Sequence, residues 1–95
     1  MEKLNETQIN ESLKKLNGWD YDGDFIHKSF QFKDFKETFA LMTQIAFECE
    51  ELNHHPNWEN VYNNLTIKLN THDADGITQK DFDLAKRMES IVSNK

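Results

Sequence analysis

The stretch DFKETFALMTQIAFECEEL, residues 34–52, predicts the central helix on which the fold depends. Asp34 can cap this helix, and Glu37 stands at the third helical position, which completes a capping box. Two stripes with mostly apolar residues run along it at helical spacing, one with Phe35, Phe39, Met42, Ala46 and Cys49 and one with Leu41, Ile45, Glu48 and Leu52. This apolar arc is wider than one sheet-facing stripe requires. We therefore expect one face to pack on a sheet and the other to meet a second copy of the chain, with a wider internal core as the alternative.

The segments around the central helix predict two β-hairpins and two outer helices, over residues 6–17 (helix), 18–32 (hairpin), 58–71 (hairpin) and 79–93 (helix). The hairpin turns are expected at Asp22-Gly23 and Asn63-Asn64, since these residues tolerate left-handed backbone geometry. Asn5 and Thr78 are placed to cap the outer helices. This order predicts a single domain over residues 1–95, an α+β two-layer sandwich with a four-stranded antiparallel sheet and three helices packed on one face.

Charge and composition exclude several classes of function. The net charge of −6 argues against nucleic acid and anionic membranes as partners, because both are bound through basic patches. No apolar stretch approaches the roughly 20 residues of a membrane helix, and the start of the chain lacks a secretory signal. The one cysteine, Cys49, cannot form an internal disulfide, which fits the reducing cytosol. A cytoplasmic protein is therefore expected.

Three histidines and one aspartate are the candidate catalytic residues. His54 and His55 follow the central helix, just before Pro56, and His72 follows the last strand. Histidine changes its charge near neutral pH and is therefore the usual general acid or base. Each residue also has a structural interpretation: a polar helix end for the pair, an ordinary loop position for His72, and capping of the last helix for Asp81. Taken alone, the His54-His55-Pro56 stretch favours the interpretation as a polar helix end over a catalytic site.

Other kinds of site have less support. A zinc or iron site is disfavoured, because the sequence has no His-x-His or His-x-x-x-His pair. Cys49 lies on an apolar stripe, which predicts an inert core thiol. Trp19 fits a core aromatic at the first hairpin better than a substrate-stacking residue. We therefore expect no metal site.

The spacing of the candidate residues is more specific than any one of them. Glu50 is followed after three residues by His54-His55-Pro56, after five more by Tyr62, after nine by His72 and after eight by Asp81. This pattern closely resembles the signature of the pterin-4a-carbinolamine dehydratases. The resemblance covers nearly the whole chain, including Gly18-Trp19, Ile26, Phe30, Phe32, Phe35 and Leu69-Asn70-Thr71-His72.

The resemblance implies a function. Enzymes of this family remove water from 4a-hydroxytetrahydropterin to give the quinonoid dihydropterin, which recycles the cofactor of the aromatic amino-acid hydroxylases. By resemblance, His54 and His72 form the acid/base pair, His55 positions the substrate within the catalytic set, and Asp81 orients a histidine. The implied pterin-binding edge and its supporting residues are Asn53, Asn70, Thr71, His72 and Asp73, with Glu50, Pro56 and Trp19.

The family implies neither a metal nor an organic cofactor, because the pterin is the substrate. It also implies a homo-oligomer, a dimer or tetramer, formed through residues 34–52. Position 53 is often acidic in such proteins, whereas Asn53 keeps the acceptor oxygen without the charge. Proteins similar to this family also serve as dimerisation cofactors of a transcription factor or as assembly chaperones. A non-catalytic binding module or a purely structural oligomer is therefore the alternative, and the complete set of histidines favours catalysis.

Overall fold

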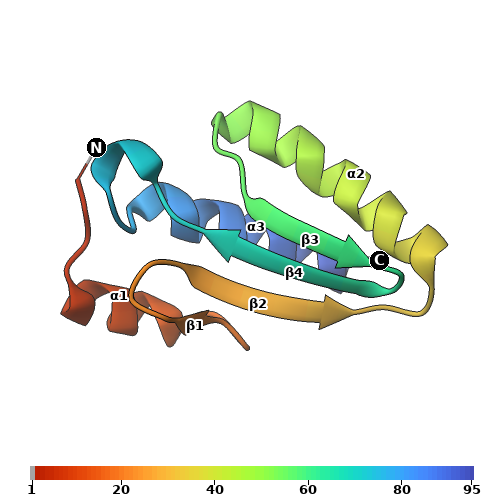
Figure 1. The fold of residues 1–95 in the computed structure, drawn as a ribbon, viewed down its shortest axis with the longest axis horizontal. Helices are drawn as coiled ribbons and strands as arrows, with labels where there is room; N and C mark the ends of the chain where they lie inside the picture. The colour runs from red at the N-terminus through yellow and green to blue at the C-terminus, as the bar shows by residue number, and fades with distance from the viewer. Residues whose placement is uncertain (1) are drawn as a thin grey trace.

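The structure, a computed structural model, describes residues 2–95. The elements follow in the order α1 (Glu6–Leu13), β1 (Asp20–Tyr21), β2 (Ile26–Gln31), α2 (Phe35–Leu52), β3 (Asn57–Val61), β4 (Asn64–Leu69), a 3-10 turn (His72–Ala74) and α3 (Gln79–Ser93). Figure 1 shows α3 crossing behind the sheet, α2 beyond β3 and α1 beside β1. The predicted α+β architecture is therefore confirmed.

The sheet has the strand order β1-β2-β4-β3, and all neighbouring strands are antiparallel. Ile26 lies opposite Leu69, and Phe30 lies opposite Leu65, so the inward side chains of β2 and β4 share one face. These residues form one buried cluster with side chains from all three helices. Alternate residues of both strands point to the opposite face, which carries polar side chains. The helices therefore cover one face, as predicted.

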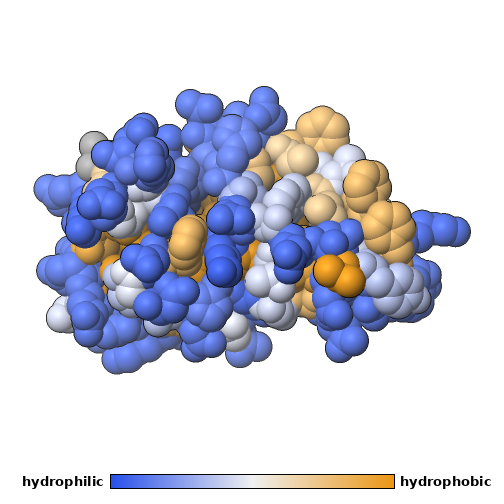
Figure 2. Space-filling view, in the orientation of Figure 1, coloured by the Kyte–Doolittle hydropathy of each residue, from blue (hydrophilic) through white to orange (hydrophobic). Residues whose placement is uncertain are grey.

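The central helix α2 has one buried and one exposed face. Its buried line consists of Thr38, Leu41, Ile45 and Cys49. Phe35 and Phe39, predicted on the same stripe as Cys49, are instead 48% and 56% exposed, and Phe47 is 70% exposed. Figure 2 shows apolar side chains gathered over the part of the surface where α2 lies. The two-faced helix is therefore present, and its binding to a second copy stays a prediction.

The start of α2 differs in detail from the expected capping box. The Asp34 carboxylate accepts a hydrogen bond from the Glu37 N–H at 2.9 Å, as predicted. The Glu37 side chain, however, accepts from the Lys33 N–H at 3.0 Å and not from Asp34. The complete boxes lie at α1, between Asn5 and Gln8, and at α3, between Thr78 and Asp81.

Two predicted boundaries are wrong by a few residues. The β3–β4 turn lies at Tyr62–Asn63, one residue before the expected pair, and Tyr62 has a positive φ of 52°. Asn63 exchanges two hydrogen bonds of 2.9 Å with Phe32 at the end of β2, and this long-range pairing sets the turn. Helix α1 ends at Leu13, because the following residues bond three positions back in a tighter turn. No helix within residues 2–95 is long and apolar enough to cross a membrane.

Candidate active site

The end of α2 places the two adjacent histidines in different surroundings. Asn53 adopts the left-handed conformation, with φ 51° and ψ 47°, which Asn tolerates because its short side chain can hydrogen-bond locally. The N–H of His54 then donates to the Cys49 carbonyl at 3.0 Å, which satisfies one of the last carbonyls of the helix. After this turn, His54 is buried and His55 is exposed.

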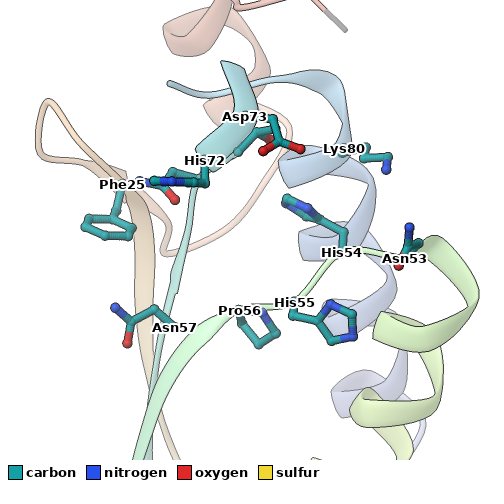
Figure 3. Close-up of a pocket in the computed structure, with 11 residues that line it drawn as sticks. Phe25, Asn53, His54, His55, Pro56, Asn57, His72, Asp73 and Lys80 are labelled. Atoms are coloured by element: carbon teal, nitrogen blue, oxygen red, sulfur yellow. The ribbon is translucent and has the colours of Figure 1, made fainter. Parts of the chain in front are cut away.

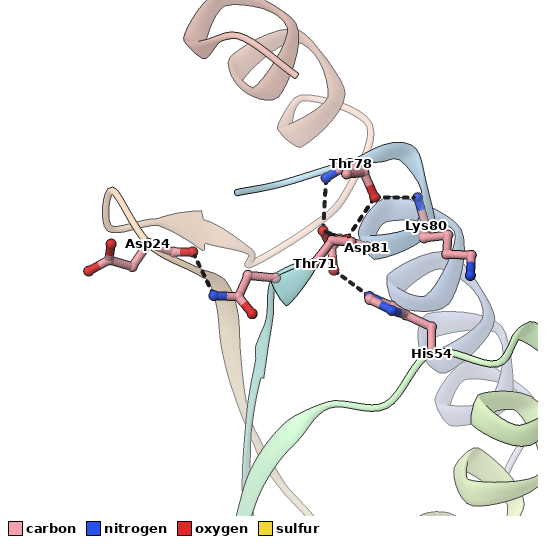
Figure 4. Close-up of polar contacts among 7 residues, drawn as sticks. Asp24, His54, Thr71, Thr78, Lys80 and Asp81 are labelled. Carbon is pink, nitrogen blue, oxygen red and sulfur yellow. Dashed lines mark hydrogen bonds and ion pairs between the residues drawn. The ribbon is translucent and has the colours of Figure 1, made fainter. Parts of the chain in front are cut away.

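His54 is held by a carboxylate from another helix. Its Nε2 lies 2.6 Å from Oδ1 of Asp81, which is completely buried in the first turn of α3 (Figure 4). An ionised carboxylate only accepts hydrogen bonds, so Nε2 is the donor in this pair. The other ring nitrogen of His54, Nδ1, is therefore the one left for a ligand.

The second oxygen of Asp81 completes a buried network. Oδ2 accepts hydrogen bonds from the Thr71 hydroxyl at 2.8 Å and from the Thr78 N–H at 2.9 Å. The two threonine hydroxyls also lie 2.7 Å apart. Within residues 2–95, no buried side-chain nitrogen or oxygen lacks a hydrogen-bond partner. The Asp81 carboxylate is thus fixed by three donors, and it fixes the His54 ring in turn.

His55 is paired on the surface. Its Nε2 lies 2.6 Å from Oε2 of Glu50, one turn back along α2, and both side chains are largely exposed. Such exposed pairs contribute little to stability. The contact therefore orients the His55 ring more than it stabilises the fold.

The turn after β4 brings in the third histidine. Thr71 and Gly76 exchange backbone hydrogen bonds of 2.8 and 3.4 Å, which closes the loop between them. Asp75 takes a left-handed conformation with φ 53° inside this loop. The closed loop presents the exposed side chains of His72 and Asp73, while Thr71 stays buried.

These segments enclose a cavity of about 530 Å³ between the end of α2 and the end of β4. Eight of the predicted site residues line it: Asn53, His54, His55, Pro56, Asn70, Thr71, His72 and Asp73. Figure 3 shows the His54 ring pointing toward the turn that carries His72 and Asp73. The volume is in the range of small-molecule sites.

The remaining predicted site residues lie outside the cavity lining. Asp81 lies behind His54, and Glu50 lies behind His55. Trp19 is a core residue, 4% exposed, whose indole N–H donates to Glu89 at 2.8 Å. Trp19 therefore has the core position that its sequence context favoured.

Three lining residues were missed by the sequence reasoning: Phe25, Asn57 and Lys80. Asn57 follows Pro56 and Lys80 precedes Asp81 in the sequence, so their position beside predicted site residues could have indicated that they line the cavity. Phe25 reaches the cavity because Ile26 pairs with Leu69, a register that the sequence does not reveal.

The thiol of Cys49 does not line the cavity. Cys49 is buried in α2, and burial raises the pKa of its thiol from 9.0 to about 11. The thiol is therefore a poor nucleophile near neutral pH. In the part of the chain that the structure describes, no three His, Cys, Asp or Glu side chains are grouped so that they could hold a metal ion.

Comparison with known proteins gives one family. Residues 2–91 match the family model described as pterin 4 alpha carbinolamine dehydratase. A candidate pterin-4-alpha-carbinolamine dehydratase from Christiangramia forsetii is 57% identical over 94 residues, which is 99% of this chain and 97% of the relative. A candidate enzyme of the same name from Rhizobium meliloti is 50% identical over 96 residues, covering 99% of this chain and 92% of the relative.

Solved structures agree on the fold. A crystal structure from Brucella melitensis, described as a transcriptional coactivator/pterin dehydratase, is 42% identical with a TM-score of 0.91, covering 95% of this chain and 98% of that one. A pterin dehydratase-like protein, described as a RuBisCO assembly factor in the alpha-carboxysome, has a TM-score of 0.68 at 22% identity, with 80% of this chain and 90% of that chain covered. At that identity, the likeness concerns the fold alone.

Proposed function

The chain belongs to the pterin 4 alpha carbinolamine dehydratase family, and on this premise we propose that it removes water from a 4a-hydroxytetrahydropterin to give the quinonoid dihydropterin. One observation carries the proposal: a buried imidazole, His54, held by Asp81 at a cavity that His55 and His72 also line. Imidazoles are suited to this reaction because it consists of proton transfers around one breaking C–O bond.

The reaction requires two proton transfers. The 4a-hydroxyl takes up a proton and leaves as water, so the C4a–O bond breaks. A ring nitrogen loses a proton, and the electron pair left behind forms the new double bond to C4a. Atoms and charge balance without an oxidant, a reductant or a metal. General acid or base catalysis of each step typically contributes about 10²–10⁴-fold.

His54 and His72 are assigned the two transfers. His54 meets the substrate through Nδ1, since its Nε2 donates to Asp81. His72 comes from the opposite wall of the cavity, on the turn after β4. His55, tied to Glu50, positions the substrate between them. Two imidazoles on different segments can act on different atoms of one ring, which a single histidine cannot do at the same moment.

The polar lining residues fit the edge of a pterin. The amino-pyrimidinone edge offers adjacent N–H donors and a carbonyl acceptor. The Asp73 carboxylate matches the donors, and the amides of Asn53 and Asn70 offer both donors and acceptors. The Thr71 hydroxyl already donates to Asp81, and its N–H donates to Gly76. Thr71 therefore shapes the site more than it bonds to the ring.

The deciding experiment is a direct assay. 4a-Hydroxytetrahydropterin is generated chemically, mixed with the protein, and its dehydration is followed by absorbance. We expect an acceleration over the uncatalysed reaction that is proportional to protein concentration. A rate equal to the protein-free rate would refute the dehydratase function.

We further infer that the protein self-associates through the exposed aromatic face of α2. Phe35, Phe39 and Phe47 are 48%, 56% and 70% exposed on this helix. Clustered exposed aromatics on a small protein usually mark an interaction surface. A helix face can pair with its own copy about a twofold axis, because the same residues then meet from both sides. The alternative function, a non-catalytic binding module, would use this same surface for another protein.

A further inference from the structure

Within residues 2–95, the cavity wall contains a single hydrocarbon aromatic ring, that of Phe25. Of the 11 lining residues, only Phe25 and Pro56 are apolar, and the others are amides, imidazoles, hydroxyl and charged groups. Phe25 is not part of the spaced motif that runs from Glu50 to Asp81. Phe25 therefore brings an aromatic face to a cavity whose other lining residues are mostly polar.

The sheet register carries Phe25 to the cavity. Ile26, the first residue of β2, pairs with Leu69, so Phe25 lies beside Asn70 where β4 leaves the sheet. Ile26 points into the core, and its neighbour Phe25 therefore points away from it. In Figure 3, Phe25 lies on the side of the cavity that also holds His72 and Asn57, across from Lys80 and Asn53.

The Phe25 position is held firmly for a residue next to a turn. The Asp22 carboxylate accepts hydrogen bonds from the N–H groups of Phe25 and Asp24 at 2.8 and 2.9 Å. These N–H groups, that of Phe25 above all, hold the pKa of the Asp22 carboxyl below its usual value. The Asn70 amide donates to the Asp24 carbonyl at 3.3 Å (Figure 4). The turn is thus fastened both to itself and to the end of β4.

A cation also faces the phenyl ring. The Lys68 ammonium lies 5.6 Å from the centre of the Phe25 ring, within the range of a cation–π contact. The ring is half-buried, so part of its surface is open to the cavity. A side chain that is held from several sides can receive a ligand with little loss of conformational entropy.

We propose that Phe25 is a substrate-positioning residue that stacks on a face of the pterin ring. A pterin is flat, with polar groups along its edges and π-electron faces above and below. The amides and the carboxylate can match the edges. His54 and His72 are needed edge-on, through their nitrogens, for proton transfer, and the His55 ring is already paired with Glu50 through Nε2. Of the two apolar lining residues, Phe25 and Pro56, Phe25 is the one with a π face to lay against the pterin, and aromatic contacts of this kind favour offset-stacked geometry. The inference rests on the proposed pterin substrate.

The test measures pterin binding separately from turnover. 7,8-Dihydrobiopterin, which has no 4a-hydroxyl to lose, is titrated into the wild type and into Phe25→Ala, Phe25→Leu and Phe25→Tyr by calorimetry. Stacking of a flat base on an aromatic side chain predicts that Phe25→Ala raises Kd about 5- to 150-fold. Phe25→Tyr should bind like the wild type, and Phe25→Leu should bind weakly, since it is apolar without a π face. Gln31→Ala, exposed at the far end of β2, is the matched control and should bind normally.

Kinetics then separate stacking on the ring from contact with the substituent. With Phe25→Ala, KM should rise by the same factor for 4a-hydroxy adducts of 6-methyl- and of dihydroxypropyl-tetrahydropterin, because both share the ring. A rise confined to the dihydroxypropyl substrate would overturn the stacking, as would a folded Phe25→Ala variant with wild-type Kd or a Phe25→Leu variant equal to Phe25→Tyr. Thermal unfolding of each variant shows that it is folded. A wild type that binds dihydrobiopterin without dehydrating the carbinolamine would refute the proposed function and leave the stacking intact.

Discussion

Asp81→Asn should abolish most of the activity while leaving the shape of the site in place. Oδ2 of Asp81 faces two donors, the Thr71 hydroxyl at 2.8 Å and the Thr78 N–H at 2.9 Å. The amide oxygen of the Asn variant must stay there, so its NH₂ group turns toward Nε2 of His54, which now has to accept. The proton of a neutral His54 then moves to Nδ1, the nitrogen that faces the substrate. That nitrogen can no longer accept a proton, and the imidazolium form is disfavoured because Nε2 would point a second donor at the NH₂ group.

The contacts of Asp81 set the expected loss of activity and the expected loss of stability. Loss of one general acid or base predicts a decrease in kcat of about 10²–10⁴-fold. Three charge-assisted hydrogen bonds become neutral or are lost, at about 1 kcal/mol each, so the free energy of unfolding should fall by about 2–3 kcal/mol. For a domain of this size that lowers Tm by about 10–20 °C.

The assay compares kcat for dehydration at a temperature well below the Tm of the variant, with circular dichroism showing that the protein is folded. Asp83→Asn is the matched control, because Asp83 lies on the same helix and its carboxylate accepts a hydrogen bond from the Gln79 side chain at 3.0 Å, away from His54. A folded Asp81→Asn protein with kcat within about threefold of wild type would refute the orientation of His54 by Asp81.

Three further predictions concern the histidines, the thiol and the helix face. His54→Ala and His72→Ala should each lose most of kcat, whereas His55→Ala should mainly raise KM; a larger kcat loss for His55→Ala would reverse the assignment. Cys49, with its pKa raised to about 11 by burial, should resist a thiol reagent at pH 8 until the protein unfolds, and rapid labelling of the folded protein would contradict this. Because the folded-state pKa is the higher one, the stability from the neutral thiol should be present below pH 9.0 and be lost as the pH approaches about 11, a loss absent from Cys49→Val in denaturant titrations. Light scattering should give a mass above that of the monomer, and Phe47→Asp should lower it; a monomer at high concentration would disprove the interface.

Much of the fold could be predicted because its signals are local. Helix α3 begins and ends where the sequence predicts, at residues 79 and 93, since Thr78 and Asp81 form a capping box within four residues of chain. The alternation in β4 predicts which side chains are buried, because a half-covered sheet imposes a period of two. The spaced histidine motif is recognised from the number of residues between its members alone. Each of these signals can be read from the sequence without knowing which distant segments pack together.

The remaining features depend on contacts between distant segments. The turn at Tyr62–Asn63 is set by Asn63 bonding to Phe32, which belongs to another hairpin. Phe25 lines the cavity only because β2 pairs with β4 in one particular register. Lys28 interrupts the alternation in β2, and its ammonium is accommodated by Glu89 of α3 at 2.7 Å. No local pattern encodes these partners, so the wall that Phe25 forms could not be predicted from the sequence.

Asp81 shows why the structural and the catalytic interpretation of a residue need not compete. A carboxylate has two oxygens, and here they have separate tasks: Oδ2 accepts from Thr78 N–H and completes the cap of α3, while Oδ1 holds His54. The cap fixes the carboxylate in the position where its Oδ1 meets Nε2 of His54 at 2.6 Å. The cap of α3 thus makes the orientation of His54 possible. The structural and the catalytic role of Asp81 are therefore not alternatives. It follows that Thr78→Ala, which removes a cap hydroxyl remote from the substrate, should lower kcat as well as Tm, because the loosened carboxylate would hold His54 less firmly. A fall in Tm with an unchanged kcat, measured where the variant is folded, would show that the two tasks of Asp81 are independent.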